Sequence, residues 1–243
     1  SPEAALKEIV CKGEYDIFEL GSVFRDEVIG KYHLAEFTML EWYRVGMNYR
    51  KLMEDVSGLL SHLGIPQKSL KISYSDLFEE TFGFCCHNAS TDRLKSIALE
   101  SGLIGSGLDL KDRVTLVNFL TAYLITEKLA NIGLVFLYDY PVELRCYSEL
   151  SLARPRFAKR FELFFDGLEL ANGYQEILSA DEQRSCFENE NRLRASRGLE
   201  QVPVDEGWLR ALENSNLSEL SGVAVGLERV LMKRDGIDDI RRL

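Results

Sequence analysis

The sequence predicts an α+β fold in which an antiparallel sheet is flanked by helices. Residues 15–43 are rich in β-branched and aromatic side chains on both sides of a loop at Gly30, a pattern that predicts two antiparallel strands. In residues 156–177, alternating runs flank Asp166-Gly167, a dipeptide typical of a two-residue hairpin turn. Helical patterns lie between and after these strand pairs, so both kinds of element share one chain segment.

The helical patterns begin directly after the first strand pair. Apolar residues recur at helical spacing within residues 52–63, and Gly64-Ile65-Pro66 ends that predicted helix. Residues 73–130 have the pattern of several helices, of which the longest is expected over residues 109–130. We expect this middle block to be an insertion or a covering layer.

Further elements follow in the second half of the chain. A strand is predicted at residues 133–140. Ser179-Ala180-Asp181-Glu182 matches a capping box, which opens a helix that runs to about Arg197 and stops at Gly198. Residues 222–226 are expected to form a strand that leads through glycine into a helix.

Composition is that of an ordinary globular protein. The chain has 243 residues, of which 46% are apolar and 28% are charged. No repeat or low-complexity linker divides it, so we expect a single mixed domain over residues 1–243. Lys plus Arg number 29 against 39 Asp plus Glu, a formal net charge of −10. An acidic chain can bind nucleic acid only through local basic patches, because screening acts over about 8 Å.

Cysteine and histidine usage favours a reduced, cytosolic chain without a zinc site. The five cysteines are scattered, odd in number and without C-x-x-C spacing, and the three histidines are far apart. Apolar runs are too short to span a bilayer. Because the first residue is Ser1 and not Met, we expect the natural N-terminus to lie further upstream.

The segment from Phe24 to Tyr43 carries the strongest functional signal. When a carboxylate attacks the α-phosphate of ATP, negative charge builds up that a fixed cation stabilises. Arg25 offers such a cation, with a planar fork of donors matched to phosphate oxygens. Glu27 can accept from an adenine amine or hold the arginine, and Phe37 can stack on a purine ring. Taken singly, each residue also fits an ordinary amphipathic strand, but the ordered set predicts a site that adenylates an amino acid.

This segment resembles motif 2 of the class II aminoacyl-tRNA synthetases, in their lysyl branch. Two positions depart from the family pattern: Asp26 stands where Asn is usual, and Leu34-Ala35 stand where Asn-Pro is usual. The resemblance implies the class II synthetase-like antiparallel sheet flanked by helices, and ATP as a substrate. With the later motifs it implies these ATP-binding residues: Arg25, Glu27, His33, Phe37, Glu169, Leu170, Gly226 and Arg229.

Two glutamates beside the predicted hairpin turn suggest a Mg²⁺ site. If the turn pairs Phe165 with Leu168, Glu162 and Glu169 share a face one diagonal step apart, about 7–8 Å between Cα atoms. Mg²⁺ on ATP takes one or two carboxylates plus phosphate oxygens. Two acids on a solvent-facing strand are the alternative. The lysyl branch has metal-coordinating glutamates at this spacing, so the resemblance implies that both bind Mg²⁺.

The residues from Glu169 to Glu176 resemble the pattern E-x-x-N-G-[FY]-x-E of the lysyl branch. A buried carboxylate is costly unless it meets a cation, so Glu3 and Glu176 would be the anions for the substrate's amino groups. Strict alternation places Glu169 opposite to Asn172 and Tyr174, and we therefore predict a β-bulge between Glu169 and Asn172. The resemblance implies a lysine or (R)-β-lysine substrate bound by Ser1, Pro2, Glu3, Tyr43, Asn172, Tyr174, Glu176 and Ala224.

Residues 222–229 resemble motif 3 of the same family, G-x-G-x-[DE]-R. Arg229 is expected in the first turn of a helix, where exposed N–H groups and the helix dipole favour phosphate. Core packing is the alternative for a glycine pair taken alone. The resemblance implies that Arg25 and Arg229 are the catalytic residues of an ATP-dependent, AMP-forming ligase.

Three sequence features favour a short paralogous branch of the lysyl-tRNA synthetases: Ser1-Pro2-Glu3, Trp42 and Ala224. That branch activates (R)-β-lysine and transfers it to a lysine side chain of elongation factor P. One alternative is a lysyl-tRNA synthetase catalytic domain that charges tRNA-Lys with lysine. A second alternative is a non-catalytic lysine or nucleotide sensor, whose motif residues should have decayed.

The nature of the acceptor is the least constrained feature. The basic clusters Arg154/Arg156/Lys159/Arg160 and Arg192/Arg194/Arg197 either face a macromolecular acceptor or lie on solvated faces. Motif 1, which in this family builds the dimer interface, and any anticodon-binding domain would precede Ser1. A homodimer is therefore expected of the full-length protein, and no membrane partner.

Overall fold

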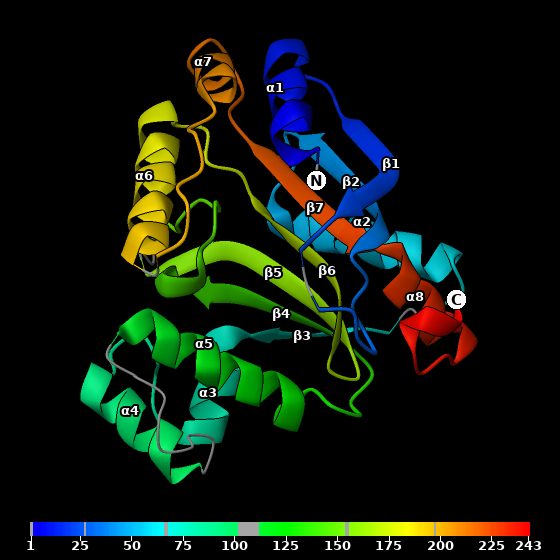
Figure 1. Cartoon of the computed structure of the whole chain (residues 1–243), viewed down its shortest axis with the longest axis vertical. Coiled ribbons are helices and arrows are strands. Elements are labelled where there is room, and N and C mark those ends of the chain that lie inside the picture. The colour runs from blue at the N-terminus through cyan, green and yellow to red at the C-terminus, as the bar shows by residue number, and fades with distance from the viewer. Residues whose placement is uncertain (1, 27, 66–67, 102–111, 154–155, 197) are drawn as a thin grey trace. The chain divides into compact units, whose positions relative to one another are not determined.

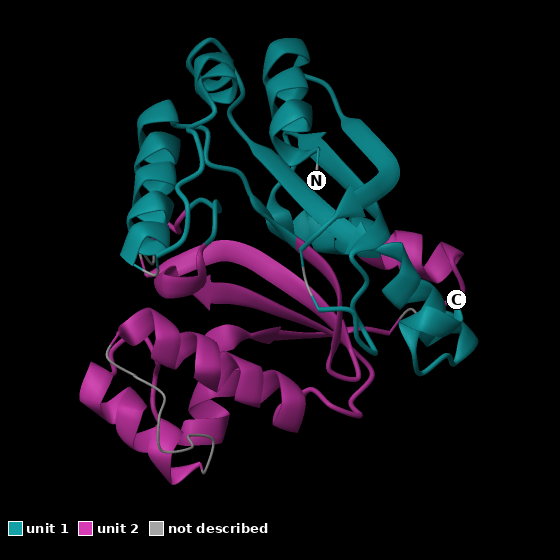
Figure 2. Cartoon of the chain, viewed as in Figure 1, with its two compact units in different colours: residues 1–56, 146–149, 173–243 teal, residues 57–145, 150–172 magenta. Residues whose placement is uncertain are grey.

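The computed structural model describes residues 2–26, 28–65, 68–101, 112–153, 156–196 and 198–243 (Figure 1). They fall into two compact units, shown in Figure 2. Unit 1 comprises residues 1–56, 146–149 and 173–243, and unit 2 comprises residues 57–145 and 150–172. The single catalytic domain expected over the whole chain stays a prediction.

Seven strands form one mostly antiparallel sheet with the hydrogen-bonded order β1-β2-β7-β6-β5-β4-β3. The strands are β1 Ile17–Phe24, β2 Glu36–Val45, β3 Leu70–Ser73, β4 Leu134–Pro141, β5 Phe157–Phe165, β6 Leu168–Gln175 and β7 Leu220–Gly226. The described α-helices are α1 Glu3–Gly13, α2 Tyr49–His62, α3 Tyr74–Phe82, α4 Thr91–Glu100, α5 Arg113–Tyr123, α6 Ala180–Ser196, α7 Glu206–Glu213 and α8 Leu227–Asp235. This arrangement confirms the predicted α+β fold.

In unit 1, the first predicted strand pair is a hairpin. β1 and β2 pair antiparallel along the whole of β1, and the Arg25 N–H donates to the Ala35 carbonyl at 2.9 Å, one bond beyond the end of β1. The other edge of β2 pairs with β7, which places Tyr43 opposite Gly222. Segments far apart in the sequence, motifs 2 and 3, therefore lie on neighbouring strands.

Helices α1 and α7 of unit 1 are not predicted in the sequence analysis. Leu6 and Val10 of α1 pack with Tyr43 and Leu220, whereas Cys11 packs with residues of α7. The helix α6 is the predicted one: the Glu182 N–H donates to Ser179 Oγ at 3.3 Å, and Gly198 has the left-handed φ of +70° expected after a helix end.

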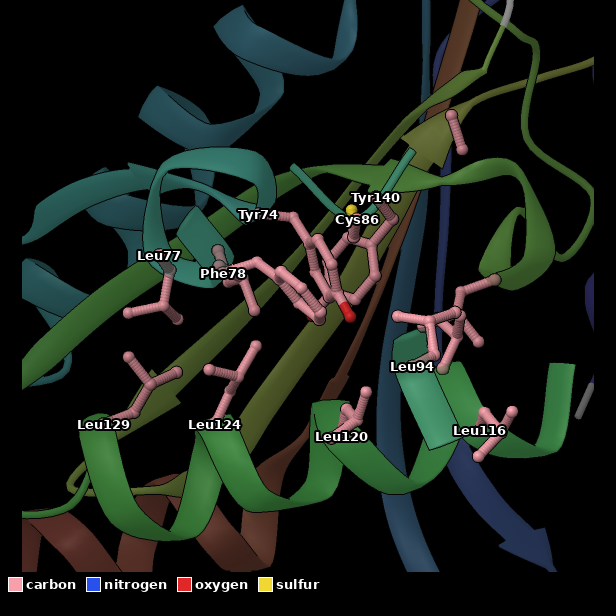
Figure 3. Close-up of a cluster of buried hydrophobic side chains, with 14 of the residues drawn as sticks. Tyr74, Leu77, Phe78, Cys86, Leu94, Leu116, Leu120, Leu124, Leu129 and Tyr140 are labelled. Carbon is pink, nitrogen blue, oxygen red and sulfur yellow. The ribbon is translucent and has the colours of Figure 1, made fainter. Parts of the chain in front are cut away.

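Unit 2 has its own apolar core, which Figure 3 shows in close-up. Side chains of α3, α4 and α5 meet buried residues of β4 and β5, with Tyr74, Phe78 and Leu120 fully buried. From Leu124 to Lys128 the α5 helix continues as a π-helix. The long helix expected over residues 109–130 is thus confirmed from Arg113 onward, and its first residues lie outside the described part of the chain.

The turn between β5 and β6 has the predicted geometry. Asp166 and Gly167 both have left-handed φ values, +49° and +77°, as a type I′ hairpin turn requires. Along β6 the burial pattern alternates from Ala171 onward, whereas Leu170 and Ala171 are both buried. Two adjacent residues facing one side are what a bulge produces, and the bulge between Glu169 and Asn172 stays a prediction.

Two further expectations concern the redox state of the cysteines and the presence of membrane-spanning helices. All five cysteines are free thiols, in accord with the reduced state expected from their spacing. Among the described residues, no helix has both the length and the apolar character that a membrane crossing requires.

Candidate active site

A buried ammonium group lies among the residues predicted to bind the amino acid. Nζ of Lys7 lies 2.6 Å from Oε1 of Glu3 and 2.8 Å from Oε2 of Glu176, and it donates to Tyr174 Oη at 3.1 Å. The Lys7 side chain is only 1% exposed. Glu3 and Lys7 are one helical turn apart on α1, so the helix directs both side chains to the same side.

Aromatic rings line the same place. Nζ of Lys7 stands 4.7 Å from the ring centre of Trp208, 4.9 Å from that of Tyr174 and 5.9 Å from that of Tyr43. Rings at these distances attract a cation through their negative faces. The Tyr174 hydroxyl also donates to Oε1 of Glu3 at 2.6 Å. Carboxylates and aromatic faces from four elements thus form a site suited to an ammonium ion.

Strand β7 lets these groups come close. A Cβ on Gly222 would lie 2.4 Å from a ring carbon of Tyr43 and 2.9 Å from Oε1 of Glu176, so only glycine leaves room for both. Two residues further along, Ala224 pairs with Glu41 of β2. Glu41 is buried and accepts a hydrogen bond from the Tyr43 hydroxyl.

Burial and charge compete within this cluster. Burial raises the pKa of Glu176 to about 8, although Lys7 pulls it down, and repulsion from Glu3 adds to the rise. Burial acts to lower the pKa of Lys7, but the attraction of Glu176 and Glu3 outweighs it and raises that pKa. For Glu3 the effect of burial is outweighed by Lys7 and Tyr174, which lower its pKa. The ammonium is therefore held charged, whereas the pKa of Glu176 lies well above that of an ordinary glutamate.

The predicted phosphate-binding arginines are also in unit 1. The guanidinium of Arg25 stands 5.6 Å from the ring centre of Phe37. Arg229 lies in the first turn of α8, as predicted, and its Nε donates to the Tyr32 carbonyl at 3.2 Å. The neighbouring Glu228 accepts from the Thr38 N–H at 2.7 Å. Motif 3 is thereby hydrogen-bonded both to β2 and to the loop of motif 2.

Other predicted site residues of unit 1 lie at the surface or at the start of a helix. His33 is exposed, Gly226 is the N-terminal cap residue of α8, and Pro2 caps α1. Ser1 and Glu27 lie outside the described residues. Their roles stay predictions.

In unit 2, one buried arginine joins two of the predicted site residues. Arg160 Nε donates to Oδ1 of Asn172 at 3.2 Å, and its NH2 group pairs with Oε1 of Glu162. Oε2 of Glu162 accepts from the Tyr140 hydroxyl at 2.6 Å. Arg160 is only 7% exposed, so its expected place on a solvated or acceptor-facing surface is wrong. Its burial follows from these partners, since a buried charge needs pairing.

The predicted Mg²⁺ ligands fit a metal that ATP would bring with it. Glu162 and Glu169 are both partly buried in unit 2, and each carboxylate oxygen has more than one lone pair, so the contacts of Glu162 leave acceptor capacity. No cluster of three or more metal-ligating side chains occurs among the described residues. Two carboxylates suffice where phosphate oxygens supply other ligands. Leu170 lies beside Glu169 on β6 and is buried.

Comparison with known proteins supports what these motifs indicate. Residues 1–243 match the family described as tRNA synthetases class II (D, K and N). This chain belongs to that family.

The class II synthetase relatives include elongation factor P–(R)-beta-lysine ligases of three bacteria. The protein of Vibrio cholerae is 36% identical over 243 residues, covering 100% of this chain and 75% of that protein. That of Pectobacterium atrosepticum is 37% identical, over 99% of this chain and 74% of that protein, and that of Proteus mirabilis is 36% identical with the same coverage.

Structure adds three residues to the site of this class II synthetase. Four predicted substrate residues come together in unit 1: Glu3, Tyr43, Tyr174 and Glu176. Lys7, Glu41 and Trp208 join them and are missing from the sequence prediction. A spacing of four between Glu3 and Lys7 was the available signal for Lys7, once residues 3–13 were recognised as a helix.

Proposed function

We propose that this chain activates (R)-β-lysine or lysine with ATP and transfers it to a lysine side chain of elongation factor P. The observation that carries the proposal is the buried site of unit 1, where two glutamates and three aromatic rings surround an ammonium group. The same groups suit the amino groups of a diamino acid. The names of the relatives support elongation factor P as the acceptor.

The reaction has two steps. In the first, an oxygen of the substrate carboxylate bonds to the α-phosphorus of ATP, the bond to the β-phosphate oxygen breaks, and pyrophosphate leaves. In the second, the uncharged amine of the acceptor lysine attacks the acyl carbon, an amide forms, and AMP leaves. A proton is released from the attacking amine.

Within unit 1, we assign the phosphates to Arg25 and Arg229 and the adenine to Phe37. Charge builds on the α-phosphate during the first step, and preorganised guanidinium groups stabilise it without reorganisation. The helix position of Arg229 supports this role, because the N-terminus of α8 adds its own positive field. His33, Glu27 and Gly226 belong to the same proposed ATP set.

In unit 2, we assign Mg²⁺ to Glu162 and Glu169. The ion would neutralise charge on the ATP phosphates when bound. Arg160 and Tyr140 hold the Glu162 carboxylate in place through both of its oxygens. Asn172, which accepts from Arg160, keeps its predicted role in binding the amino acid.

Two other functions would use the same binding residues. A lysyl-tRNA synthetase domain would transfer the acyl group to tRNA-Lys, and a lysine or nucleotide sensor would bind without reacting. The proposal further includes a homodimer of the full-length protein and a cytoplasmic location. Five free thiols and a translation-factor acceptor favour that compartment.

The deciding experiment supplies the protein with ATP, labelled lysine or labelled (R)-β-lysine, and either elongation factor P or tRNA-Lys. We expect label in elongation factor P, with (R)-β-lysine as the better donor. Label in tRNA-Lys alone would establish the synthetase alternative instead. Binding of lysine without pyrophosphate release would favour the sensor.

A further inference from the structure

The predicted substrate pocket already contains a cation of the protein itself. Lys7 brings one positive charge to a place where three buried or partly buried carboxylates face one another: Glu3, Glu41 and Glu176. Lys7 lies outside the family motifs and has no predicted role. Its position raises the question of whether it mimics the ligand or belongs permanently to the pocket.

Exposure favours the permanent role. The side chains of Lys7 and Glu176 are 1% and 2% exposed, whereas that of Glu3 is 37% exposed. An incoming ammonium group would therefore reach Glu3 from solvent, with the Lys7–Glu176 pair behind it. Moving Lys7 away would leave Glu176 as a buried carboxylate without its cation, which is strongly unfavourable.

Lys7 sets the net charge that the pocket offers to the substrate. With all groups ionised, three carboxylates and one ammonium have two negative charges in excess. A diamino acid whose carboxylate has been joined to AMP as the acyl-adenylate brings two ammonium groups to the pocket. Without Lys7, a third buried negative charge would be unmatched, and Glu176 would take up a proton instead of accepting from the substrate.

We propose that Lys7 is a positioning residue of the amino-acid pocket. Its ammonium group bridges Glu3 and Glu176, and the negative charge that then remains in the pocket suits a substrate with two amino groups. The identity of that substrate rests on the proposed function. The titratable groups that face the Lys7–Glu176 pair are Glu3 and Cys11 of α1, Glu41 and Tyr43 of β2, and Tyr174 of β6.

The first arm of the test measures substrate binding. Lysine and (R)-β-lysine are titrated calorimetrically into the wild type, Lys7→Met and Lys7→Arg between pH 6.5 and 9. We expect Lys7→Met to bind at least about tenfold more weakly at pH 7.5 and to need a higher pH for half-maximal affinity, because Glu176 then keeps its proton more tightly. Lys7→Arg should lie between the two. The KM for the amino acid should rise more than the KM for ATP, since Lys7 contacts the predicted amino-acid residues and not the phosphate-binding arginines. Unchanged affinity and an unchanged pH profile in Lys7→Met would overturn the proposal.

The second arm needs no substrate and so separates this inference from the proposed function. Urea unfolding is compared at pH 5 and pH 9 for the wild type and Lys7→Met. A glutamate whose folded-state pKa is raised contributes stability that is present below its unfolded pKa and is lost as the pH rises through the folded pKa. Removing Lys7 raises the folded pKa of Glu176 further, so the loss extends to higher pH. Lys7→Met should therefore cost more stability at pH 9 than at pH 5, and an equal loss at both would contradict the inference.

A third variant covers the case in which Lys7→Met does not fold. The double variant Lys7→Met/Glu176→Gln removes the cation and its buried partner together, so no carboxylate is left unpaired at that place. We expect it to be more stable than Lys7→Met alone at pH 9. A double variant no more stable than the single one would show that Lys7 does not balance Glu176. If instead the wild type binds neither diamino acid while the unfolding arm behaves as expected, the proposed function fails and the Lys7–Glu176 pairing stands.

Discussion

The ring of Tyr43 lies so close to Gly222 that a Cβ on that glycine would stand 2.4 Å from ring carbon Cε1. The two residues are opposite one another in the β2–β7 ladder. The same Cβ would come within 2.9 Å of Oε1 of Glu176. A single hydrogen atom at Gly222 therefore determines how near an aromatic ring and a carboxylate can approach each other.

Gly222→Ala tests this relationship. The added methyl should displace Tyr43 or Glu176, cost about 1–3 kcal/mol of unfolding free energy and raise the KM for the amino acid more than that for ATP. Urea denaturation and steady-state pyrophosphate exchange measure the two effects. Gly58→Ala is the matched control, because a Cβ there meets nothing within 4 Å in helix α2, and it should stabilise by up to about 1 kcal/mol. Equal behaviour of the two variants would contradict the close approach.

Arg25→Ala tests the assignment of the α-phosphate. Loss of one charge-stabilising donor should cost roughly 3–4 kcal/mol in the transition state and lower adenylate formation by about 100- to 1000-fold. Pyrophosphate exchange measures this directly. Lys51→Ala, which removes one exposed positive charge from α2, should retain near-normal exchange. Near-normal exchange in Arg25→Ala would remove this arginine from the catalytic set.

The pH dependence of amino-acid binding tests the charge state of Glu176. Its pKa of about 8 means that the carboxyl is mostly protonated at pH 6.5 and mostly ionised at pH 9. An ammonium group binds the ionised form, so affinity should rise roughly tenfold from pH 6.5 to 8, with proton release on binding at neutral pH. Calorimetry in buffers of different ionisation enthalpy measures both. Glu176→Gln should bind more weakly and lose the dependence, and a flat profile in the wild type would refute the assignment.

Ala224→Gly tests selectivity between the two lysine isomers. Ala224 is half-buried and pairs with Glu41 across the β2–β7 ladder, which places the two side chains on the same face of the sheet. One methyl in a packed pocket shifts relative preference by about 1–3 kcal/mol. Glycine should therefore improve kcat/KM for α-lysine relative to (R)-β-lysine. A ratio that does not change would exclude Ala224 from the discrimination, whatever happens to the absolute rates.

Several elements were predictable from local patterns. The Asp166-Gly167 turn, the helix N-cap at Ser179 and the strand-to-helix passage at Gly226 each depend on backbone preferences of a few adjacent residues, and all are present. The helices α1 and α7 were not predicted. Their stability comes from packing on distant residues such as Tyr43 and Leu220 and on each other, which no short window of sequence displays.

The site residues likewise fall into those that the sequence predicts and those that only the structure reveals. Sequence by itself determined the family, and it predicted the two arginines, the paired glutamates and the lysine-type pocket, because each follows from residue types in a motif of fixed spacing. Only the tertiary structure placed Lys7 between Glu3 and Glu176, and buried Arg160 against Glu162 and Asn172. The reason is physical: whether a lysine or an arginine is a surface charge or a buried counter-ion depends on which carboxylates the fold brings within about 3–4 Å. Glu176, the buried partner of Lys7, lies far from it in the chain.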